Sequence, residues 1–316
     1  MESIESKTSS PAILANGCIV TLGDFDGIHL GHRKLLKKAK QIAEKDNLPV
    51  LLLSYNPSPK VILGKQKSGI QLLNPKERAR ILKEIGINVF YLYPFTKETT
   101  LITAKDFLRN FLLGTLKAKH IVIGYDHCFG RHRRGNYKYL KLASAKYNFG
   151  LTQCKEVSLW GKKISSSSIK SSLQAGKVEE ASKKLGSLFP VSGTVIKGAQ
   201  RGAKLGFPTA NINISSDKIL PQDGVYVTIA LIKGHKYASI TNIGKNPTFN
   251  LAEISVECHI FDFLDDIYNE EIVIYFVLKI RNEIKFSGID QLKRQIEKDC
   301  SVAKNYFKRR KSLLSR

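Results

Sequence analysis

Two different hydrophobic patterns follow one another along the chain, and their succession most constrains the fold. From residue 18 to about residue 155, short apolar runs alternate with stretches of helical periodicity. This alternation predicts βαβ units, a parallel sheet and helices on both of its faces. Ligands of such sheets bind beyond the carboxyl ends of the strands.

Individual elements follow from the periodicity and from helix-start signals. Asn74 and Pro75 form an N-cap followed by a proline at the first helical position. We expect strands at 18–22, 50–54, 88–93, 120–124 and 151–157, and helices at 75–85, 104–113 and 137–146. A further helix has one apolar face, made of Leu35, Leu36, Ala39, Ile42 and Ala43.

The pattern changes near residue 187. Runs rich in β-formers follow at 193–196, 225–232, 238–242, 255–261 and 271–280. Only 290–307 has helical periodicity, with Leu292, Ile296, Val302 and Ala303 as its apolar positions. Several strands and one terminal helix predict a small β-barrel or sandwich. We place the domain boundary between Gly186 and Val191, which gives domains 1–186 and 187–316.

Composition indicates a globular protein and a reducing compartment. Of the 316 residues, 42% are hydrophobic and 25% charged, and no apolar run has the roughly 18 residues that a membrane span needs. The first twelve residues lack the apolar core of a secretory signal. The five cysteines are scattered without C-x-x-C spacing, which argues against a disulfide framework or zinc site. We therefore expect a cytoplasmic protein without membrane contact.

The net charge of +24 is the one extreme value. Such a chain attracts anions, and nucleotides, phosphorylated cofactors and nucleic acid all satisfy that requirement. The Lys residues are spread over the whole chain, and we interpret the clusters 131–134 and 308–311 as solvated surface. Because no aromatic-interleaved basic stripe is evident, we expect no nucleic-acid site.

The strongest local motif lies between the first strand and the first helix of the α/β part. Free backbone N–H groups at a helix start favour phosphate, and glycines let the backbone approach a ligand closely. Two imidazoles three residues apart can stabilise charge on an attacked α-phosphate. Histidines near helix starts are, however, often only caps. The segment reads Gly23-Asp24-Phe25-Asp26-Gly27-Ile28-His29-Leu30-Gly31-His32.

This segment resembles the signature of the nucleotidylyltransferase superfamily, and its flanks resemble the bacterial FAD synthetase branch. Further resemblances to that branch lie at 55–59, 124–130 and 164–170. The resemblance implies a Rossmann-like fold, catalytic roles for His29 and His32, and flavin binding at Pro57. It also implies ATP binding by Gly23, Asp24, Phe25, Gly31, Asp126, Ser165, Ser166, Ser167 and Lys170.

Several positions depart from the pattern of that branch. Tyr55 replaces the common Phe, and Ser58 replaces a frequent His. The run of four serines reaches Ser168, and alone it would predict only a flexible loop. The remaining departures are His127, Cys128, Ser167 and Lys170. Lys170 replaces an Arg, which keeps the charge but loses the bidentate fork. Together these departures predict slow adenylyl transfer.

The second motif lies at 192–215. Three glycines, Gly198, Gly202 and Gly206, allow a loop that wraps a phosphate with backbone amides. Thr209 and Asn211 are two residues apart, so in an extended segment their oxygens share one face and suit Mg²⁺ carried by a nucleotide. From the residues alone, a glycine-rich turn between strands explains the segment equally well.

This stretch resembles the G-x-x-x-R-G-x-x-L-G-F-P-T-A-N signature of riboflavin kinases, which are small antiparallel β-barrels. The resemblance continues at 221–226, 242–249, 256–260 and 281–299. It implies that Glu257 is the base near the riboflavin 5′-hydroxyl and that Arg281 binds flavin. Thr209 and Asn211 would bind Mg²⁺ with ATP, assisted by Gly198 and Lys204.

The combined expectation is an α/β nucleotidylyltransferase domain followed by a β-barrel kinase domain. Its ligands would be ATP, riboflavin, FMN and FAD, with Mg²⁺ as the cofactor. The alternative keeps the kinase and makes the N-terminal domain a degenerate module. A nucleic-acid-binding protein would explain the charge but not the ordered motifs. The sequence leaves a homo-oligomer open.

Overall fold

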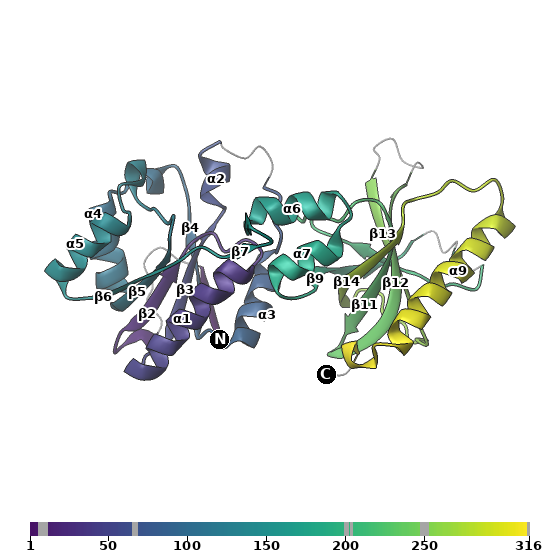
Figure 1. Cartoon of the computed structure of the whole chain (residues 1–316), viewed down its shortest axis with the longest axis horizontal. Coiled ribbons are helices and arrows are strands. Elements are labelled where there is room, and N and C mark those ends of the chain that lie inside the picture. The colour runs from purple at the N-terminus through teal and green to yellow at the C-terminus, as the bar shows by residue number, and fades with distance from the viewer. Residues whose placement is uncertain (6–11, 65–68, 199–201, 203–204, 247–252, 315–316) are drawn as a thin grey trace. The chain divides into compact units, whose positions relative to one another are not determined.

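The computed structural model describes residues 1–5, 12–64, 69–198, 202, 205–246 and 253–314. The chain divides into two compact units, Met1–Ser165 and Ser166–Arg316. Figure 1 shows a parallel α/β sheet in the first unit and a β-barrel in the second. Both predicted fold classes are therefore confirmed.

The first unit is built on a parallel sheet of six strands in the order β1-β4-β3-β2-β5-β6. All five predicted strands are present, with ends shifted by a few residues, and β1 is an addition that the sequence did not predict. Successive strands pair in parallel, as the alternation with helices required. The strands are β1 (Glu2–Glu5), β2 (Cys18–Leu22), β3 (Val50–Asn56), β4 (Val89–Pro94), β5 (Ala118–Gly124) and β6 (Gly150–Cys154).

The residues that cap the helices determine where the helices of this unit begin. Helix α3 (Pro75–Ile85) begins at the predicted proline, and Asn74 and Glu77 form a reciprocal capping box. The other predicted α-helices are α1 (Leu30–Asp46) and α5 (Tyr137–Tyr147). The short elements are η1 (Ala12–Leu14), α2 (Pro59–Ile62), η2 (Glu98–Leu101), η4 (Arg131–Arg133) and the hairpin strands β7 (Ser158–Leu159) and β8 (Lys162–Lys163).

The helix predicted at 104–113 is present, but most of it is a π-helix. A short α4 (Ala104–Asp106) continues directly into a π-helix, η3 (Phe107–Thr115). The apolar residues of η3 that are buried recur at the spacing Phe107, Leu108, Phe111 and Leu112, which also fits an α-helix. Apolar spacing therefore does not distinguish the two hydrogen-bond patterns of the backbone.

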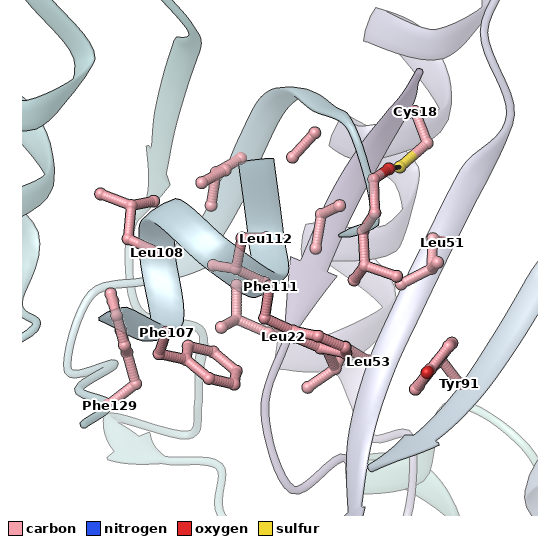
Figure 2. Close-up of a cluster of buried hydrophobic side chains, with 14 of the residues drawn as sticks. Cys18, Leu22, Leu51, Leu53, Tyr91, Phe107, Leu108, Phe111, Leu112 and Phe129 are labelled. Atoms are coloured by element: carbon pink, nitrogen blue, oxygen red, sulfur yellow. Dashed lines mark hydrogen bonds between the residues drawn. The ribbon is translucent and has the colours of Figure 1, made fainter. Parts of the chain in front are cut away.

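One face of the sheet is covered by η3 and α5. Figure 2 shows Phe107, Phe111 and Leu112 from η3 beside Leu22 and Leu53 from the central strands. The ring centroids of Tyr91 and Phe111 are 5.7 Å apart in an edge-on contact. This large cluster gives the sheet a rigid centre from which the loops at its carboxyl ends project.

The opposite face carries α1 and α3. Side chains alternate along β2, so Ile19 and Thr21 point away from the cluster of Figure 2. Helix α1 turns four buried residues toward the sheet: Leu35, Leu36, Ala39 and Ala43. Ile42, also predicted on this apolar face, is only partly buried.

The second unit contains a closed antiparallel barrel in the order β10-β13-β12-β11-β14-β9. Two helices, α6 (Ser166–Gln174) and α7 (Val178–Leu185), precede it and group with this unit. The predicted division at Gly186 stays a prediction. The strands are β9 (Phe189–Ile196), β10 (Ala210–Asn213), β11 (Gly224–Ile232), β12 (His235–Asn246), β13 (Glu253–Ile260) and β14 (Glu271–Arg281).

A long terminal helix packs against the barrel (Figure 1). Helix α9 (Ile289–Lys308) contacts β12 and buries Cys300, Ala303 and Phe307 in one apolar cluster with barrel residues such as Ile240 and Val227, and η5 (Lys311–Leu313) follows it. Of the four apolar positions predicted for this helix, Val302 is 41% exposed and so does not belong to the buried face. Ala303, its neighbour on the helix, is the residue that meets the barrel.

Candidate active sites

The first candidate site is the loop that joins β2 to α1. His29 is the N-cap of α1, and its Nδ1 accepts a hydrogen bond from the backbone N–H of His32 at 3.4 Å. The two imidazole rings stack, with centroids 3.7 Å apart. A Cβ on residue 31 would lie 3.1 Å from the His29 ring, so Gly31 allows the stack to form close to the backbone.

Both histidines are held as neutral imidazoles. Burial lowers the pKa of His29 to about 4, although Asp26 acts in the opposite direction. Burial and then the neighbouring His29 lower the pKa of His32 well below its ordinary value. Within the described part of the chain, Nδ1 of His32 is buried without a hydrogen-bond partner. Such an atom is ready to exchange a hydrogen bond with a bound ligand.

Asp24 faces Ser58, the N-cap of α2, and Lys60 in the first turn of that helix. Its carboxylate accepts a hydrogen bond from Ser58 Oγ at 3.0 Å, and Lys60 Nζ lies 3.8 Å away. Burial and the nearby Asp26 raise the pKa of Asp24, whereas Lys60 and Ser58 lower it. The departure at Ser58 therefore provides a direct partner for Asp24. Pro57, the predicted flavin residue, is exposed and follows a cis peptide bond.

Asp126 lies after β5, at the carboxyl edge of the sheet. It forms an ion pair with Lys163 of the β7–β8 hairpin at 3.0 Å, and Lys163 Nζ is 4.6 Å from the Tyr125 ring centroid. Both ion-pair partners are exposed, so the pair adds little stability. His127 stacks with Phe129 at 6.1 Å and thus keeps an aromatic ring where the FAD synthetase pattern has Phe.

The serine segment lies at the junction of the two units. Ser165 ends the first unit, and α6 begins with Ser166 and Ser167 in its first turn and has Lys170 in the second. Their joint action with the histidine pair stays a prediction. Gly23 and Phe25 lie in the β2–α1 loop itself, and a Cβ on residue 23 would be 3.3 Å from the Phe25 ring.

The second candidate site is a row of polar residues across three barrel strands. Asn211 of β10 stands opposite Glu257 of β13, and Glu257 stands opposite Asn242 of β12. Directly opposed residues of antiparallel strands project to the same face. The row therefore brings a carboxylate between two amides. Asn242 lies in a segment that resembles the riboflavin kinases, but the sequence predicted no role for it.

Glycines bring the loop before β10 close to this row. A Cβ on residue 198 would lie 2.1 Å from Nδ2 of Asn211, so the backbone of Gly198 touches that amide. A Cβ on residue 202 would lie 2.4 Å from the carbonyl oxygen of Phe207. Some predicted positions lie outside the described residues. These are Lys204, predicted to bind ATP, and the residues Pro247, Thr248 and Phe249 of the segment that resembles the kinases.

A cavity adjoins Thr209. Its volume is about 330 Å³, and its wall includes Thr209, Cys258 and the segment 263–268 with Asp265 and Asp266. Small-ligand sites have volumes of a few hundred cubic ångströms and a small number of placed polar groups. Thr209, predicted to bind Mg²⁺ with ATP, is therefore part of a concave surface.

His259 holds the turn that carries Thr209, and the sequence did not reveal this. The imidazole Nδ1 lies 2.7 Å from the carbonyl oxygen of Pro208. A carbonyl only accepts, so Nδ1 carries the proton in this contact. Phe207 adds an edge-on ring contact with His259 at 5.7 Å. Side chains alternate along β13, so His259 lies on the same face as Glu257. This shared face was the only feature of the sequence that could have indicated a role for His259.

Arg281 is fixed by a buried carboxylate. Its Nε and Nη2 donate to Oδ2 of Asp299 at 2.9 and 2.8 Å, and Gln295 donates to Oδ1. Asp299 is 2% exposed, so this fork is shielded from solvent. The predicted flavin residue is therefore held in one orientation by helix α9.

Neutral oxygens, not a carboxylate cage, are available for a cation beside β10. Across the described ranges, no group of three or more His, Cys, Asp or Glu side chains could hold a metal ion. Thr209 and Asn211 offer a hydroxyl and an amide oxygen. Mg²⁺ binds proteins through few such ligands when nucleotide phosphates and waters supply the others.

Comparison with known families divides the chain in the same two parts. The FAD synthetase family model matches residues 13–168, and the riboflavin kinase family model matches residues 185–307. The first match covers strands β2 to β6 of the parallel sheet and the histidine pair. The second covers the whole barrel and most of α9.

Relatives resemble the chain over nearly its whole length. It is 36% identical to the bifunctional riboflavin kinase/FMN adenylyltransferase of Bacillus subtilis over 92% of both chains. Identity to the protein of that name from Escherichia coli K12 is 33%, over 92% of this chain and 93% of the relative.

A solved structure, described as a macrolide-efflux protein from Streptococcus pneumoniae, has a TM-score of 0.87 and 35% identity over 96% of this chain and 99% of its own. In the present chain, none of the described helices is long and apolar enough to cross a membrane. The two family models and the full-length relatives show that this chain belongs to the bifunctional riboflavin kinase/FMN adenylyltransferase family.

Proposed function

We propose that the chain converts riboflavin to FAD in two reactions. ATP phosphorylates the riboflavin 5′-hydroxyl to give FMN and ADP, and a second ATP then adenylylates FMN to give FAD and pyrophosphate. The observation that carries the proposal is the presence of both family models in one chain, each over the unit with the matching fold. The degenerate N-terminal module is not favoured, because the first model extends over strands β2 to β6 and the histidine pair.

In the barrel, the proposed roles follow from the polar row. Glu257 takes the proton of the riboflavin hydroxyl as it attacks the γ-phosphate. Thr209 and Asn211 bind ATP together with Mg²⁺, which neutralises phosphate charge. The backbone at Gly198 and the cation of Lys204 add phosphate contacts. Arg281 lines the flavin side in the orientation that Asp299 gives it.

In the α/β unit, the proposed centre is the stacked histidine pair. Neutral His29 and His32 can donate hydrogen bonds to the α-phosphate as it is attacked, without a covalent intermediate. Pro57 lines the flavin site. The remaining ATP residues are Gly23, Asp24, Phe25, Gly31, Asp126, Ser165, Ser166, Ser167 and Lys170. Lys170 meets phosphate as a point charge, so we expect FAD formation to be slow and FMN to accumulate.

The two activities are tested together by incubating the purified protein with riboflavin, ATP and Mg²⁺ and separating the flavins over time. We expect FMN first and FAD later. His32→Ala should abolish FAD formation and leave FMN formation intact, whereas Lys170→Arg should keep or raise the FAD rate. If the wild type makes no FAD from FMN over many hours, the N-terminal unit is degenerate.

We also propose that the net charge reflects surface Lys and not a nucleic-acid site, and that the protein works in the cytoplasm. A titration of duplex and single-stranded nucleic acid at increasing salt tests the first statement. Tight binding that persists at physiological salt with a sequence preference would contradict it.

A further inference from the structure

A buried arginine contacts the back of the β2–α1 loop. Arg78, in the first turn of α3, is 3% exposed. Its Nη1 donates to the backbone carbonyl of Asp24 at 3.3 Å and to Ser54 Oγ at 3.1 Å. Its Nη2 donates to Gln71 Oε1 at 3.2 Å, and the guanidinium lies 5.8 Å from the centroid of the Phe90 ring. The guanidinium is thus fixed from several sides.

The same carbonyl has a second donor. Ser54 Oγ, at the end of β3, donates to the Asp24 carbonyl at 2.9 Å. Two residues along the loop, Asp26 Oδ1 accepts from the backbone N–H groups of Leu72 at 2.7 Å and Leu73 at 3.4 Å. Arg78 of α3 and the segment that leads into α3 therefore hold the loop on the two sides of Phe25, at Asp24 and at Asp26.

The conformation of Phe25 explains why such restraint is needed. Its φ is +49°, a left-handed value that costs free energy for a residue with a Cβ. Ile28 has a φ of +44°, and Gly27 has a φ of +93°. Backbones of this kind persist where surrounding contacts over-determine them. The ring of Phe25 is 1% exposed and lies 4.8 Å from the His32 ring, so the turn and the histidine pair are packed together.

The Asp24 carbonyl also sets the direction of the next N–H group. In a trans peptide the C=O and N–H point in opposite directions. A carbonyl that is drawn toward Arg78 therefore turns the backbone N–H of Phe25 to the other side of the loop. A guanidinium buried behind this loop adds positive potential where few water molecules screen it.

We propose that Arg78 is a positioning residue for adenylyl transfer: by holding the Asp24 carbonyl, it orients the Phe25 N–H and keeps the turn against which His32 packs. The inference rests on the proposed function of the α/β unit. Arg78 acts through the loop, not on the reacting atoms. The ligand that this arrangement serves is the triphosphate of ATP.

The test compares Arg78→Gln, Arg78→Lys and Arg78→Ala with Lys76→Gln, which removes an exposed cation two residues earlier on the same helix. FMN adenylylation and riboflavin phosphorylation are measured on each full-length protein. We expect Arg78→Gln to lower kcat for FAD formation roughly 10- to 100-fold, the usual cost of a small misplacement of reacting groups. Lys76→Gln should match the wild type, and Arg78→Lys should retain an intermediate rate. FMN formation should be unchanged throughout.

Two further measurements separate positioning from folding. Added guanidinium, at millimolar concentration, should restore part of the FAD rate of Arg78→Ala. Ser54→Ala removes the second donor to the same carbonyl with little change of volume, so it should slow FAD formation less than Arg78→Gln does. Its effect combined with Arg78→Lys should be non-additive, because both side chains act on one atom.

The outcomes also separate this inference from the proposed function. If the wild type forms FAD and neither Arg78→Lys nor Ser54→Ala changes kcat, Arg78 has no positioning role while the function stands. Loss of thermal stability in these variants without a change in kcat would equally overturn the inference. A wild type that forms FMN but never FAD would overturn both.

Discussion

Asn211 on β10 stands directly opposite Glu257 on β13, although 46 positions separate them in the sequence. On its other side Glu257 is paired with Asn242 of β12. The carboxylate that the kinase resemblance implied as a base therefore lies beside the amide implied to bind Mg-ATP. In the proposed kinase reaction, this adjacency would hold the attacking hydroxyl and the γ-phosphate within one row of side chains.

Removing the carboxylate should impair only the kinase reaction. We expect Glu257→Gln to slow FMN formation by roughly 10²- to 10⁴-fold, the usual contribution of a general base. Formation of FAD from supplied FMN should not change. Glu271→Gln, on an exposed position of β14, is the matched control. An unaltered phosphorylation rate in Glu257→Gln would remove this residue from the mechanism.

A methyl group at residue 198 should displace Asn211. The added Cβ would lie 2.1 Å from the amide nitrogen, so either the loop or the side chain must move. We expect Gly198→Ala to raise the KM for ATP in riboflavin phosphorylation roughly 10-fold or more. Gly69→Ala serves as the control, because its Cβ would meet nothing within 4 Å. A KM equal to that of the wild type would show that the Asn211 orientation is unimportant.

The hydrogen bond from His259 to Pro208 should support ATP binding through the turn that carries Thr209. His259→Asn keeps an N–H donor near the position of Nδ1, whereas His259→Phe keeps a ring without a donor. One such bond is worth about 0.5–1.5 kcal/mol, so we expect the Phe variant to raise the KM for ATP roughly 2- to 10-fold. The Asn variant should stay near the wild type. Steady-state kinetics that show the reverse order would contradict this role.

His29 should make the free energy of unfolding depend on pH. Its pKa is about 4 in the folded protein, because burial disfavours the imidazolium, and near 6.5 when unfolded. The unfolded chain therefore binds the proton first as the pH falls, and the stability present above pH 6.5 is lost between 6.5 and 4. For a shift of this size, the loss by pH 4.5 is about 2.5 kcal/mol.

Denaturant titrations of the wild type and His29→Asn at pH 7.5 and 4.5 measure this effect. Asn remains a good N-cap for α1 but does not titrate. As the pH falls, the free energy of unfolding of the wild type should therefore decrease more than that of the variant. A difference that stays constant with pH would mean that His29 is not held neutral.

The boundary at Gly186 can be tested with two fragments, 187–316 and 166–316. We expect both to fold and to phosphorylate riboflavin, since compact units have their own core. The longer fragment keeps three buried side chains of α7: Val178, Ala181 and Leu185. Their loss should lower the free energy of unfolding by roughly 3–6 kcal/mol, measured as a lower midpoint in denaturant. A folded but inactive 187–316 fragment would show that the kinase site needs upstream residues.

Local chemistry made some parts of this protein predictable. Asn74 and Pro75 identified the first residue of α3, because cap and proline preferences depend on immediate neighbours. The helix at 104–113 shows the limit of such reasoning. The sequence predicted a helix there, yet the backbone around Phe107 and Phe111 is a π-helix. Apolar spacing reports which face is buried, and tertiary packing selects the turn geometry.

Arg78 shows a second limit. In the sequence it is one of several charged residues on an amphipathic helix, where periodicity alone predicts a solvated position. In the structure it is buried against Ser54 and the Asp24 carbonyl. The sequence of α3 does not indicate those partners, because they lie near the ends of β2 and β3, more than twenty residues away in the chain.

The sequence by itself determined the order of a parallel α/β unit and a β-rich unit, the elements of each and the motifs that show the family. These depend on hydrophobic period, cap chemistry and residue order, all of which are local. The tertiary structure alone decided that His29 and His32 stack as neutral rings, that Arg78 holds their loop, and that Asn211 faces Glu257. Burial and strand register cause these relationships, and both arise only when segments distant in the chain close into a sheet or a barrel.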